Sequence, residues 1–332
     1  EAYSRALNGF IVSREQNYQL ELRSGICCVE DSDASDINSL LDRANMALKT
    51  IKMKGAAQWK FYDRTMRDKL LREKDLEIRM EKALADGEFL VYIQPKYWVG
   101  TRALAGGEAL VRWKSPDQGF LSPGEFIPLF EKNRFIVKLD QFMFTSVCGL
   151  LRQWLDAGIE PRPLSVNVSQ MQFHTPDFVE RYIGIKSQYA IPDGLLELEF
   201  TESIFFDNVA LLSSAVHEFR RAGIKCSIDD FGAGYSSLNV LKALPVSVLK
   251  LDGMFFRTAK DDEQANIVIR NIMRMAGELK MATVAEGVET PEQVAFLETT
   301  GCDIIQGYVF ARPMPAAEFT ELLAGEGGHA ER

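Results

Sequence analysis

From Phe89 onward, short apolar runs alternate with longer stretches in which apolar residues recur at helical spacing. Such runs, bounded by Gly, Asp, Asn or Pro, are typical of buried strands, and the longer stretches are typical of amphipathic helices. The runs predict strands near 89–97, 103–112, 163–168, 195–201, 225–230, 247–252, 281–285 and 303–309. The longer stretches predict helices near 123–131, 135–157, 177–190, 208–222, 236–243, 262–279, 291–300 and 316–324.

This alternation of strand and helix predicts an α/β fold. Eight strands with crossover helices fit a TIM (β/α)8 barrel. A doubly wound open sheet fits the same periodicity, and the periodicity alone does not separate the two folds. Gly158, Gly223 and Gly301 each follow a predicted helix, at a position where glycine commonly ends one.

The first 64 residues carry a smaller pattern of their own. It predicts a strand in QLELRSGICCVE, a helix in DASDINSLLDRANMALKTIKMKG with an Asp or Ser cap before Ile37, and a last short strand ending at Phe61 and Tyr62. We therefore expect a small α+β unit over 1–64, a charged linker helix over 65–86, a main domain over 87–325 and a tail over 326–332. The linker is either a solvated helix with one packed face or a helix that transmits a signal.

The chain is acidic, which argues against one broad class of partner. It carries 38 Lys and Arg against 47 Asp and Glu, a formal net charge of −9. General nucleic-acid binders present a basic surface, so DNA is not an expected partner. An anionic ligand remains compatible with this charge where bound metal ions supply positive charge locally.

The cysteines and the chain start bear on the compartment. The five cysteines are scattered without a CxxC motif, so reduced thiols are expected rather than a disulfide framework. No apolar run is long enough to span a membrane, and the first residues show no signal-peptide pattern. Because the chain does not begin with Met, we interpret it as a cytoplasmic fragment of a longer protein, with no membrane contact of its own and any anchor or sensor upstream.

Acidic or amide residues recur at the ends of the predicted strands. They are Glu108, Asn167, Glu199, Asp229, Asp230, Glu286 and Gln306. Each alone has a plain structural explanation, such as a strand rim, a turn or a helix cap. A parallel barrel, however, would gather them at one mouth, where they would repel one another without a cation. Oxygen ligands without His or Cys suit Mg²⁺ or Mn²⁺, and two such ions suit phosphodiester hydrolysis.

Two local features strengthen this interpretation. Adjacent Asp229 and Asp230 would point apart at a strand end unless the backbone turns, and the glycines of FGAGYSS permit that turn. Lys250 is a charged residue within the predicted strand SVLKLDG. A buried lysine needs a carboxylate partner or a catalytic reason, and here it can orient an attacking water or stabilise developing negative charge.

These residues carry a family resemblance. From about Asp86 to Pro315 the chain resembles the EAL domain, the family of bacterial cyclic di-GMP phosphodiesterases. The name motif stands as Glu108-Ala109-Leu110, followed by Val111-Arg112-Trp113. The other family blocks are present in order as YIQP, SPGEFIPLFE, LSVNVSQ, LELEFTES, SIDDFGAGYSS, LKLDG, VAEGVET and DIIQGYVFARPMP.

The resemblance implies a modified TIM barrel with one antiparallel strand, and hydrolysis of cyclic di-GMP to linear pGpG with two Mg²⁺ or Mn²⁺ ions per active site. It implies metal ligands at Glu108, Asn167, Glu199, Asp229, Asp230 and Glu286. It implies catalytic roles for Lys250, Glu286 and Glu108, and substrate contacts at Gln94, Leu110, Arg112 and Gln306. Glu202 matches a glutamate that orders the DDFGAGYSS loop. That loop also makes dimer contacts in the family, so a homodimer through this domain is expected.

The mechanism that we predict divides the ligands between two cations bridged by Asp229. Glu108, Asn167 and Glu199 complete one site, and Asp230 and Glu286 complete the other. A water between the cations attacks phosphorus in line and expels the ribose 3′-oxygen, with Lys250 positioning that water. The sequence leaves open whether Glu286 also takes the proton.

The departures from the family pattern are few. Ala233 stands where Thr is common, and Phe130 and Lys132-Asn133-Arg134 replace the usual small and acidic residues around Glu131. No predicted metal or catalytic position is substituted. A receptor that binds cyclic di-GMP without turnover and signals through 65–86 is the alternative, and a scaffold is a more remote one.

The first unit resembles the C-terminal half of a GGDEF domain, the diguanylate cyclase family, through LRSGICCVE, LLDRANMALKTIKMKG and FYD. Lys49-Thr50-Ile51 departs from the usual Tyr-Ala-Lys pattern of that family. The GGDEF motif and the phosphate-binding first half are absent from the chain, so cyclase activity is not expected of it.

Overall fold

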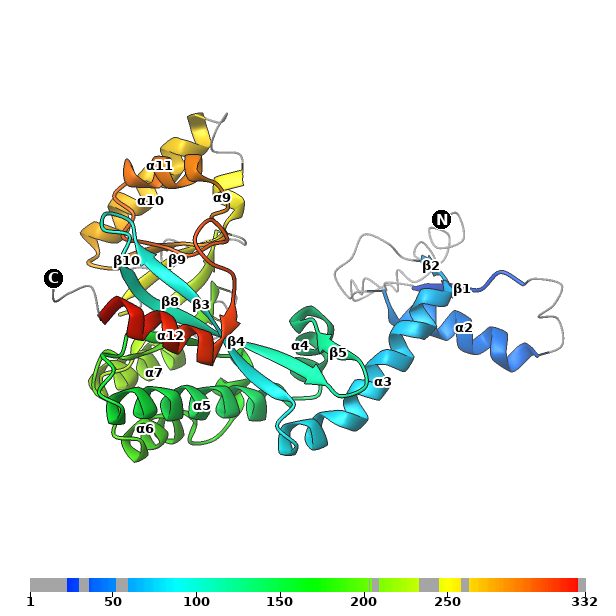
Figure 1. Cartoon of the computed structure of the whole chain (residues 1–332). Coiled ribbons are helices and arrows are strands. Elements are labelled where there is room, and N and C mark those ends of the chain that lie inside the picture. The colour runs from blue at the N-terminus through cyan, green and yellow to red at the C-terminus, as the bar shows by residue number, and fades with distance from the viewer. Residues whose placement is uncertain are drawn as a thin grey trace. The chain divides into compact units, whose positions relative to one another are not determined.

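A computed structural model describes residues 23–29, 36–51, 59–202, 204, 209–232, 245–257 and 263–327 (Figure 1). The chain divides into two compact units, 1–79 and 80–332. Among the described residues, no helix is both long and apolar enough to cross a lipid bilayer. The described cysteines are all free thiols, as the sequence predicts.

The first unit contains a two-stranded parallel sheet and one helix packed against it. Strand β1 (Ser24–Ile26) pairs with β2 (Trp59–Phe61), and α2 (Ile37–Lys49) contacts both strands. The Asp36 side chain caps α2 by accepting hydrogen bonds from the backbone N–H groups of Asn38 and Ser39. The charged helix α3 (Arg64–Ala85) follows, and the division between the two units falls within it.

The second unit is built on a closed barrel of eight strands. They are β3 (Phe89–Trp98), β4 (Leu104–Ser115), β6 (Leu164–Asn167), β7 (Leu196–Thr201), β8 (Lys225–Phe231), β9 (Val248–Leu251), β10 (Ala282–Ala285) and β11 (Ile304–Ile305). From β4 round to β11 the neighbouring strands of the barrel are parallel. Strand β3 closes the ring by pairing antiparallel with both β4 and β11. The closed ring confirms the modified TIM barrel and excludes the doubly wound open sheet.

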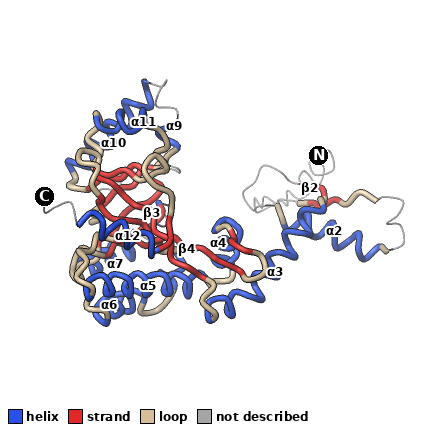
Figure 2. Tube along the Cα trace, viewed as in Figure 1, coloured by secondary structure: helices blue, strands red, loops and turns tan. Residues whose placement is uncertain are grey.

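Helices cover the outside of the barrel (Figure 2). They are α4 (Pro123–Lys132), α5 (Ile136–Asp156), α6 (Phe178–Gln188), α7 (Val209–Arg221), α9 (Met254–Arg257), α10 (Glu263–Glu278), α11 (Pro291–Glu298) and α12 (Ala316–Gly327). The long helix α5 shows how they pack, because its apolar stripe of Met143, Phe144, Val147 and Leu151 belongs to the core, and α5 contacts β3, β4 and β6. The helix predicted at 236–243 lies outside the described residues.

The predicted helix ends are confirmed, and a few short elements were not predicted. Gly158, Gly223 and Gly301 adopt φ values of +71°, +72° and +80°, the left-handed conformation that ends a helix. The unpredicted elements are α9, the 3-10 turn η2 (Gln170–His174), and the short strands β5 (Gly119–Leu121) and β12 (Met314–Pro315). These elements are too short to show a hydrophobic period.

Candidate functional site

Strand register places the predicted site residues on the inner face of the barrel. Directly paired residues point to the same side of a sheet, and side chains alternate along each strand. Glu108 pairs with Ser165 on β6 and with Gln94 on β3, while Asn167 pairs with Glu199 on β7. The same alternation continues through the remaining strands to Asp229, Lys250, Glu286 and Gln306. Because seven of the eight strands run parallel, their carboxyl ends meet at one mouth.

Lys250 lies at the centre of this mouth and is completely buried. Its Nζ is 2.6 Å from Glu199 Oε2, 2.6 Å from Glu286 Oε1, 2.9 Å from Asp229 Oδ1 and 3.7 Å from Glu108 Oε2. Burial acts to lower the pKa of Lys250, but these four carboxylates raise it well above its usual value. Lys250 therefore remains an ammonium ion that faces the carboxylates of four strands.

Each carboxylate oxygen of Glu108 accepts a hydrogen bond from a side-chain amide. Asn167 Nδ2 donates to Glu108 Oε1 at 2.7 Å, and Gln306 Nε2 donates to Glu108 Oε2 at 2.6 Å. The same Gln306 nitrogen lies 3.2 Å from Gln94 Oε1, and Gln94 Nε2 donates to the carbonyl of Ala311. The structure thus brings together four residues that the sequence predicts for the site.

Glu199 is held by two lysines, one of which the sequence analysis missed. Lys250 takes Oε2, while Lys96 on β3 donates to Oε1 at 3.0 Å and to Ser165 Oγ at 2.7 Å. Burial would raise the pKa of Glu199, but the charges of Lys250 and Lys96 outweigh it and hold the pKa at about 2. The sequence signal for Lys96 is its alternation with Gln94 in YIQPKY, which puts both on one face of the strand.

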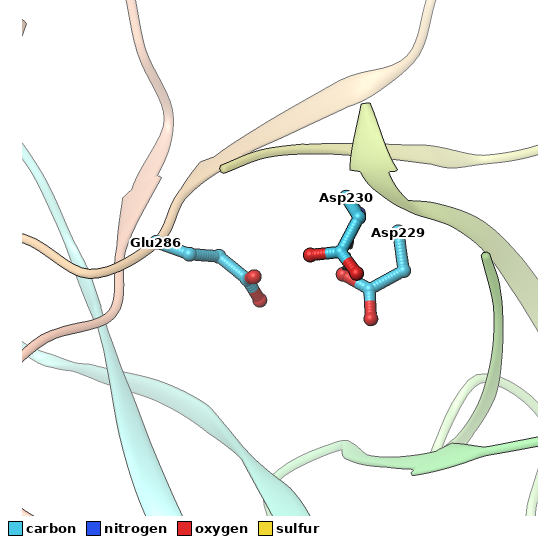
Figure 3. Close-up of side chains that lie close together, drawn as sticks. All are labelled: Asp229, Asp230 and Glu286. Atoms are coloured by element: carbon cyan, nitrogen blue, oxygen red, sulfur yellow. Dashed lines mark hydrogen bonds between the residues drawn. The ribbon is translucent and has the colours of Figure 1, made fainter. Parts of the chain in front are cut away.

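Asp229, Asp230 and Glu286 form an open acidic cluster. They converge on one space from β8 and from the end of β10 (Figure 3). One carboxylate oxygen from each lies within 4.8 Å of the others. Asp230 adopts φ +53°, and the pairing of β8 with β9 shifts register between Ile228 and Phe231. This local irregularity turns neighbouring Asp229 and Asp230 toward the same space. The sequence analysis assigned the turn to the glycines that follow, whereas Asp230 itself adopts the left-handed conformation.

Glu202 lies at the end of β7, beside the start of the loop after β8. Its Oε2 accepts a hydrogen bond from the backbone N–H of Gly232 at 3.1 Å. Gly232 has φ +93°, which a residue with a Cβ adopts only with strain, and a Cβ there would meet the Phe255 ring. Ala233 and the rest of the DDFGAGYSS loop lie outside the described residues.

The five carboxylates at the mouth carry more negative charge than Lys96 and Lys250 can balance. Burial is the largest cause that raises the pKa values of Glu108, Asp230 and Glu286, and neighbouring carboxylates add to it. Two of these acids, Asp230 and Glu286, face Asp229 across a shared space, and the three carboxylates together can hold a divalent cation. Carboxylate oxygens are the ligands that Mg²⁺ and Mn²⁺ prefer, so the donor set fits such an ion.

Two hollows adjoin the acids. One, of about 290 Å³, is lined by Gln94, Glu108, Leu110, Glu286, Gln306 and the exposed Tyr308. The other, of about 220 Å³, is lined by Leu110, Arg112, Asn167 and residues of α4 and α5. All four residues predicted to contact the substrate therefore line one or both of these hollows. A larger groove, of about 950 Å³, runs along α5, and none of the predicted site residues lines it.

The second hollow is also lined by Asp140, a largely buried acid that the sequence analysis missed. Asp140 on α5 accepts hydrogen bonds at Oδ2 from Ser169 N at 3.0 Å and from Gln172 Nε2 at 3.2 Å. Burial raises the pKa of Asp140 to about 7. These bonds fix the turn that follows Asn167. The signal in the sequence is an acid within the apolar stripe of the helix predicted at 135–157.

Comparison with known proteins supports the same family. Residues 78–313 match the EAL domain family model. The chain is 34% identical over 292 residues, 88% of its length, to "Cyclic di-GMP phosphodiesterase NbdA" of Pseudomonas aeruginosa, covering 37% of that protein. It is 32% identical over 287 residues, 86% of its length, to "Cyclic di-GMP phosphodiesterase PdeR" of Escherichia coli, covering 43% of that protein. The chain thus spans less than half the length of these curated relatives.

Solved structures show the same fold. "PaMucR Phosphodiesterase, c-di-GMP complex" is 34% identical, with a TM-score of 0.70 over 74% of this chain and 99% of that chain. "Structure of EAL Enzyme Bd1971 - cAMP and cyclic-di-GMP bound form" is 30% identical, with a TM-score of 0.71 over 78% of this chain and 73% of that chain. This chain belongs to the EAL domain family of phosphodiesterases.

Proposed function

We propose that this chain hydrolyses cyclic di-GMP to linear pGpG with two divalent cations, Mg²⁺ or Mn²⁺, at the barrel mouth. The observation that carries the proposal is the set of carboxylates at the mouth. Glu108, Glu199, Asp229 and Glu286 surround the buried Lys250. The exposed Asp230 joins Asp229 and Glu286 around one shared space. The names of the curated relatives support the choice of substrate and reaction. Lowering of this second messenger in a bacterial cytoplasm would be the consequence.

The two sides of the mouth would each hold one cation. Glu108, Asn167 and Glu199 would bind one ion, Asp230 and Glu286 would bind the other, and Asp229 would bridge the two. When bound, the cations would supply Lewis acidity to the phosphodiester and to the attacking water. The mutual repulsion of the buried acids supports this assignment, because a cation would relieve it.

Lys250 and Glu286 are the residues that we assign to the chemical step. Their Nζ and Oε1 atoms lie 2.6 Å apart. An ammonium ion beside a carboxylate can orient a water by donating to its oxygen, while the carboxylate accepts the proton that the water loses. The ammonium ion also stabilises the negative charge that develops on the phosphoryl oxygens.

Four residues at the rim would bind the nucleotide: Gln94, Leu110, Arg112 and Gln306. Gln94 and Gln306 line the same hollow as Glu108 and Glu286, so they can contact a ligand held against the acids. Gln306 Oε1 is buried and accepts no hydrogen bond from the described residues, which leaves an acceptor for a ligand donor. The Arg112 guanidinium lies 5.6 Å from the centre of the Tyr92 ring, and its Nη1 donates to the carbonyl of Val111.

The test is turnover of cyclic di-GMP with Mg²⁺ or Mn²⁺, compared with the Glu108→Ala variant. We expect the parent to release pGpG, seen by chromatography, and Glu108→Ala to release none. Glu278→Ala on α10 is a matched control, because this glutamate side chain is exposed and lies outside the site. Binding of cyclic di-GMP without release of pGpG would replace the enzyme with a receptor, and a lack of any nucleotide-dependent thermal shift would favour a scaffold.

The homodimer through this domain and the GGDEF-like origin of the first unit are further proposals. Glu202 and Gly232 support the first, because their hydrogen bond fixes the start of the loop that the family resemblance assigns to dimer contacts. Light scattering on the purified chain tests it, and a mass of one chain at working concentration would contradict it. The β1–α2–β2 arrangement is compatible with the second proposal but is too small to identify a family.

A further inference from the structure

Lys96 is a buried lysine to which the proposed mechanism gives no role. It lies on β3, the antiparallel strand, and is 6% exposed. Burying an ammonium ion is costly unless it is paired and hydrogen-bonded. Lys96 meets this need through Glu199 Oε1, at 3.0 Å, and Ser165 Oγ, at 2.7 Å.

Lys96 and Lys250 divide the two oxygens of Glu199 between them. Lys96 on β3 donates a hydrogen bond to Oε1, and Lys250 on β9 donates one to Oε2. The two lysines are not equivalent, because Lys250 Nζ also lies within 4 Å of Glu108, Asp229 and Glu286. Among the described residues, Lys96 forms its ion pair with Glu199 alone.

The neighbours of Lys96 extend this contact into a chain of hydrogen bonds. Ser165 Oγ, which accepts from Lys96, itself donates to the carbonyl of Gly107. Gly107 precedes Glu108, so one hydrogen-bonded chain links Lys96 to the strand that carries another predicted ligand. Glu197, two residues before Glu199 on β7, faces the same interior and adds negative charge near the ammonium ion.

We propose that Lys96 is a positioning residue, which anchors Oε1 of Glu199 so that Oε2 is presented to a divalent cation at the mouth. The inference rests on the proposed function, because it assigns Glu199 to a cation site. A cation can draw Oε2 away from Lys250, which has three other carboxylates, while Lys96 keeps the side chain from rotating. Residues that orient a ligand in this way change metal affinity without touching the metal.

The experiment is Mn²⁺ titration of the purified chain, with free Mn²⁺ followed by electron paramagnetic resonance. We expect the parent to bind two equivalents. Lys96→Met should weaken one equivalent about tenfold or more and leave the other, held by Asp229, Asp230 and Glu286, nearly unchanged. With cyclic di-GMP as substrate, kcat should fall while KM changes little, because the Gln94–Gln306 side of the site is intact.

Lys186→Met is the matched control. Lys186 on α6 is equally buried, at 7% exposed, and it pairs with Asp193 and the carbonyl of Ala222 away from the barrel mouth. It should lower the thermal unfolding temperature without changing either Mn²⁺ equivalent. Equal weakening of Mn²⁺ binding by Lys96→Met and Lys186→Met would overturn the proposal, because both would then act through stability alone.

A double variant tests whether Lys96 acts through Glu199. In the Glu199→Gln background, adding Lys96→Met should cause no further loss of Mn²⁺ affinity, whereas an additional tenfold loss would overturn the proposal. Two unchanged equivalents in Lys96→Met would overturn it as well, and the proposed function would still stand. A parent chain that binds no Mn²⁺ would instead refute the two-cation function itself, and this inference with it.

Discussion

On the β4–β6–β7 side of the barrel mouth, Glu108 and Glu199 accept hydrogen bonds from side chains of other parts of the barrel. On the β8–β10 side, Asp229, Asp230 and Glu286 instead face one another across a shared space. The first side, which we name the paired side, has its acids oriented by donors of the protein. The second, which we name the open side, gathers three carboxylates, and Lys250 forms ion pairs with Asp229 and Glu286.

The difference shows two ways of preparing acids for a cation. On the paired side, donors fix each carboxylate before any ligand arrives, so little ordering remains to be done on binding. On the open side, the free energy of bringing the acids together is unfavourable until a cation neutralises them. Removal of an acid should therefore destabilise the protein on the paired side and relieve repulsion on the open side.

Glu199→Gln should give the largest effect on stability. It keeps the shape of the side chain but leaves Lys96 without its recorded ion pair, in a site where both side chains are buried. Loss of one partner from a buried ion pair costs about 3–5 kcal/mol, so we expect the free energy of unfolding without metal to fall by that amount. Urea unfolding followed by circular dichroism measures it.

Glu160→Gln is the control for this variant, because its side chain is exposed and its ion pair with Arg162 lies on the surface. An unchanged free energy of unfolding in Glu199→Gln would show that the paired side is not held by its ion pairs. Turnover should also be lost, because Glu199 is assigned to a cation.

Asp230→Asn should act in the opposite direction on the open side. Asn tolerates the φ of +53° at this position, so the backbone is preserved while one repelling charge is removed. We expect the metal-free protein to keep or slightly gain stability. Mn²⁺ at about 100 times its dissociation constant should stabilise the parent by about 2.7 kcal/mol for each bound ion, and the variant should lose most of the share that comes from the open-side ion.

Differential scanning calorimetry with and without Mn²⁺ measures both quantities for Asp230→Asn. Asp252→Asn is a useful comparison, since Asp252 follows β9 and lies near Asp230 without being an assigned ligand. A clear loss of metal-free stability in Asp230→Asn would refute the view that the open side stores repulsion.

The pH dependence of stability should reflect the open side. Burial raises the pKa values of Asp230 and Glu286, so the folded protein holds protons that the unfolded chain releases above about pH 4–5. Stability without metal should therefore decrease as the pH rises above about 4–5. Saturating Mn²⁺ should abolish the decrease.

Asp140 contributes to the same slope, because burial raises its pKa to about 7. The Asp140→Asn variant can keep both hydrogen bonds at the oxygen, so it should flatten part of the slope and leave the part that Mn²⁺ removes. Glu199 acts in the opposite direction, because the lysines depress its pKa to about 2. Its stabilisation is present above about pH 4–5 and is lost only as the pH falls toward 2. Stability that rises as the pH increases above about 4–5, in the absence of metal, would contradict the prediction.

Ser165→Ala should give the smallest effect, on the paired side. It removes one acceptor of the Lys96 ammonium ion but keeps the ion pair with Glu199. We expect a loss of about 1 kcal/mol in the free energy of unfolding, and a smaller change in Mn²⁺ affinity than in Lys96→Met. Ser227→Ala is matched, because Ser227 is a buried serine on the same inner face whose hydroxyl donates to the carbonyl of Leu198. Equal effects of the two serine variants on Mn²⁺ affinity would remove the special role of Ser165.

Local patterns predicted the strands, the helices and the acids at the strand ends, whereas the choice of a closed barrel over an open sheet came from the family resemblance. Each strand can be recognised in the sequence as an apolar run. An acid at the carboxyl end of a strand lies at the mouth of the barrel when the strands run parallel. The partners were not predictable in the same way. That Lys250 would meet four carboxylates, or that Lys96 would reach Glu199, depends on register between strands far apart in the chain, which no local pattern records.

Strand β3 has a consequence for how the domain folds. It is the first barrel strand in the chain, yet it hydrogen-bonds to β11 and β12 near the other end, and Gln94 contacts Gln306 across 212 residues. Contacts of such long sequence separation slow folding, because the loop between them must close before they contribute any stability. During synthesis, β3 can pair with β11 only after almost the whole domain has left the ribosome. The proposed cation sites should therefore form only after β11 has been synthesised and has paired with β3.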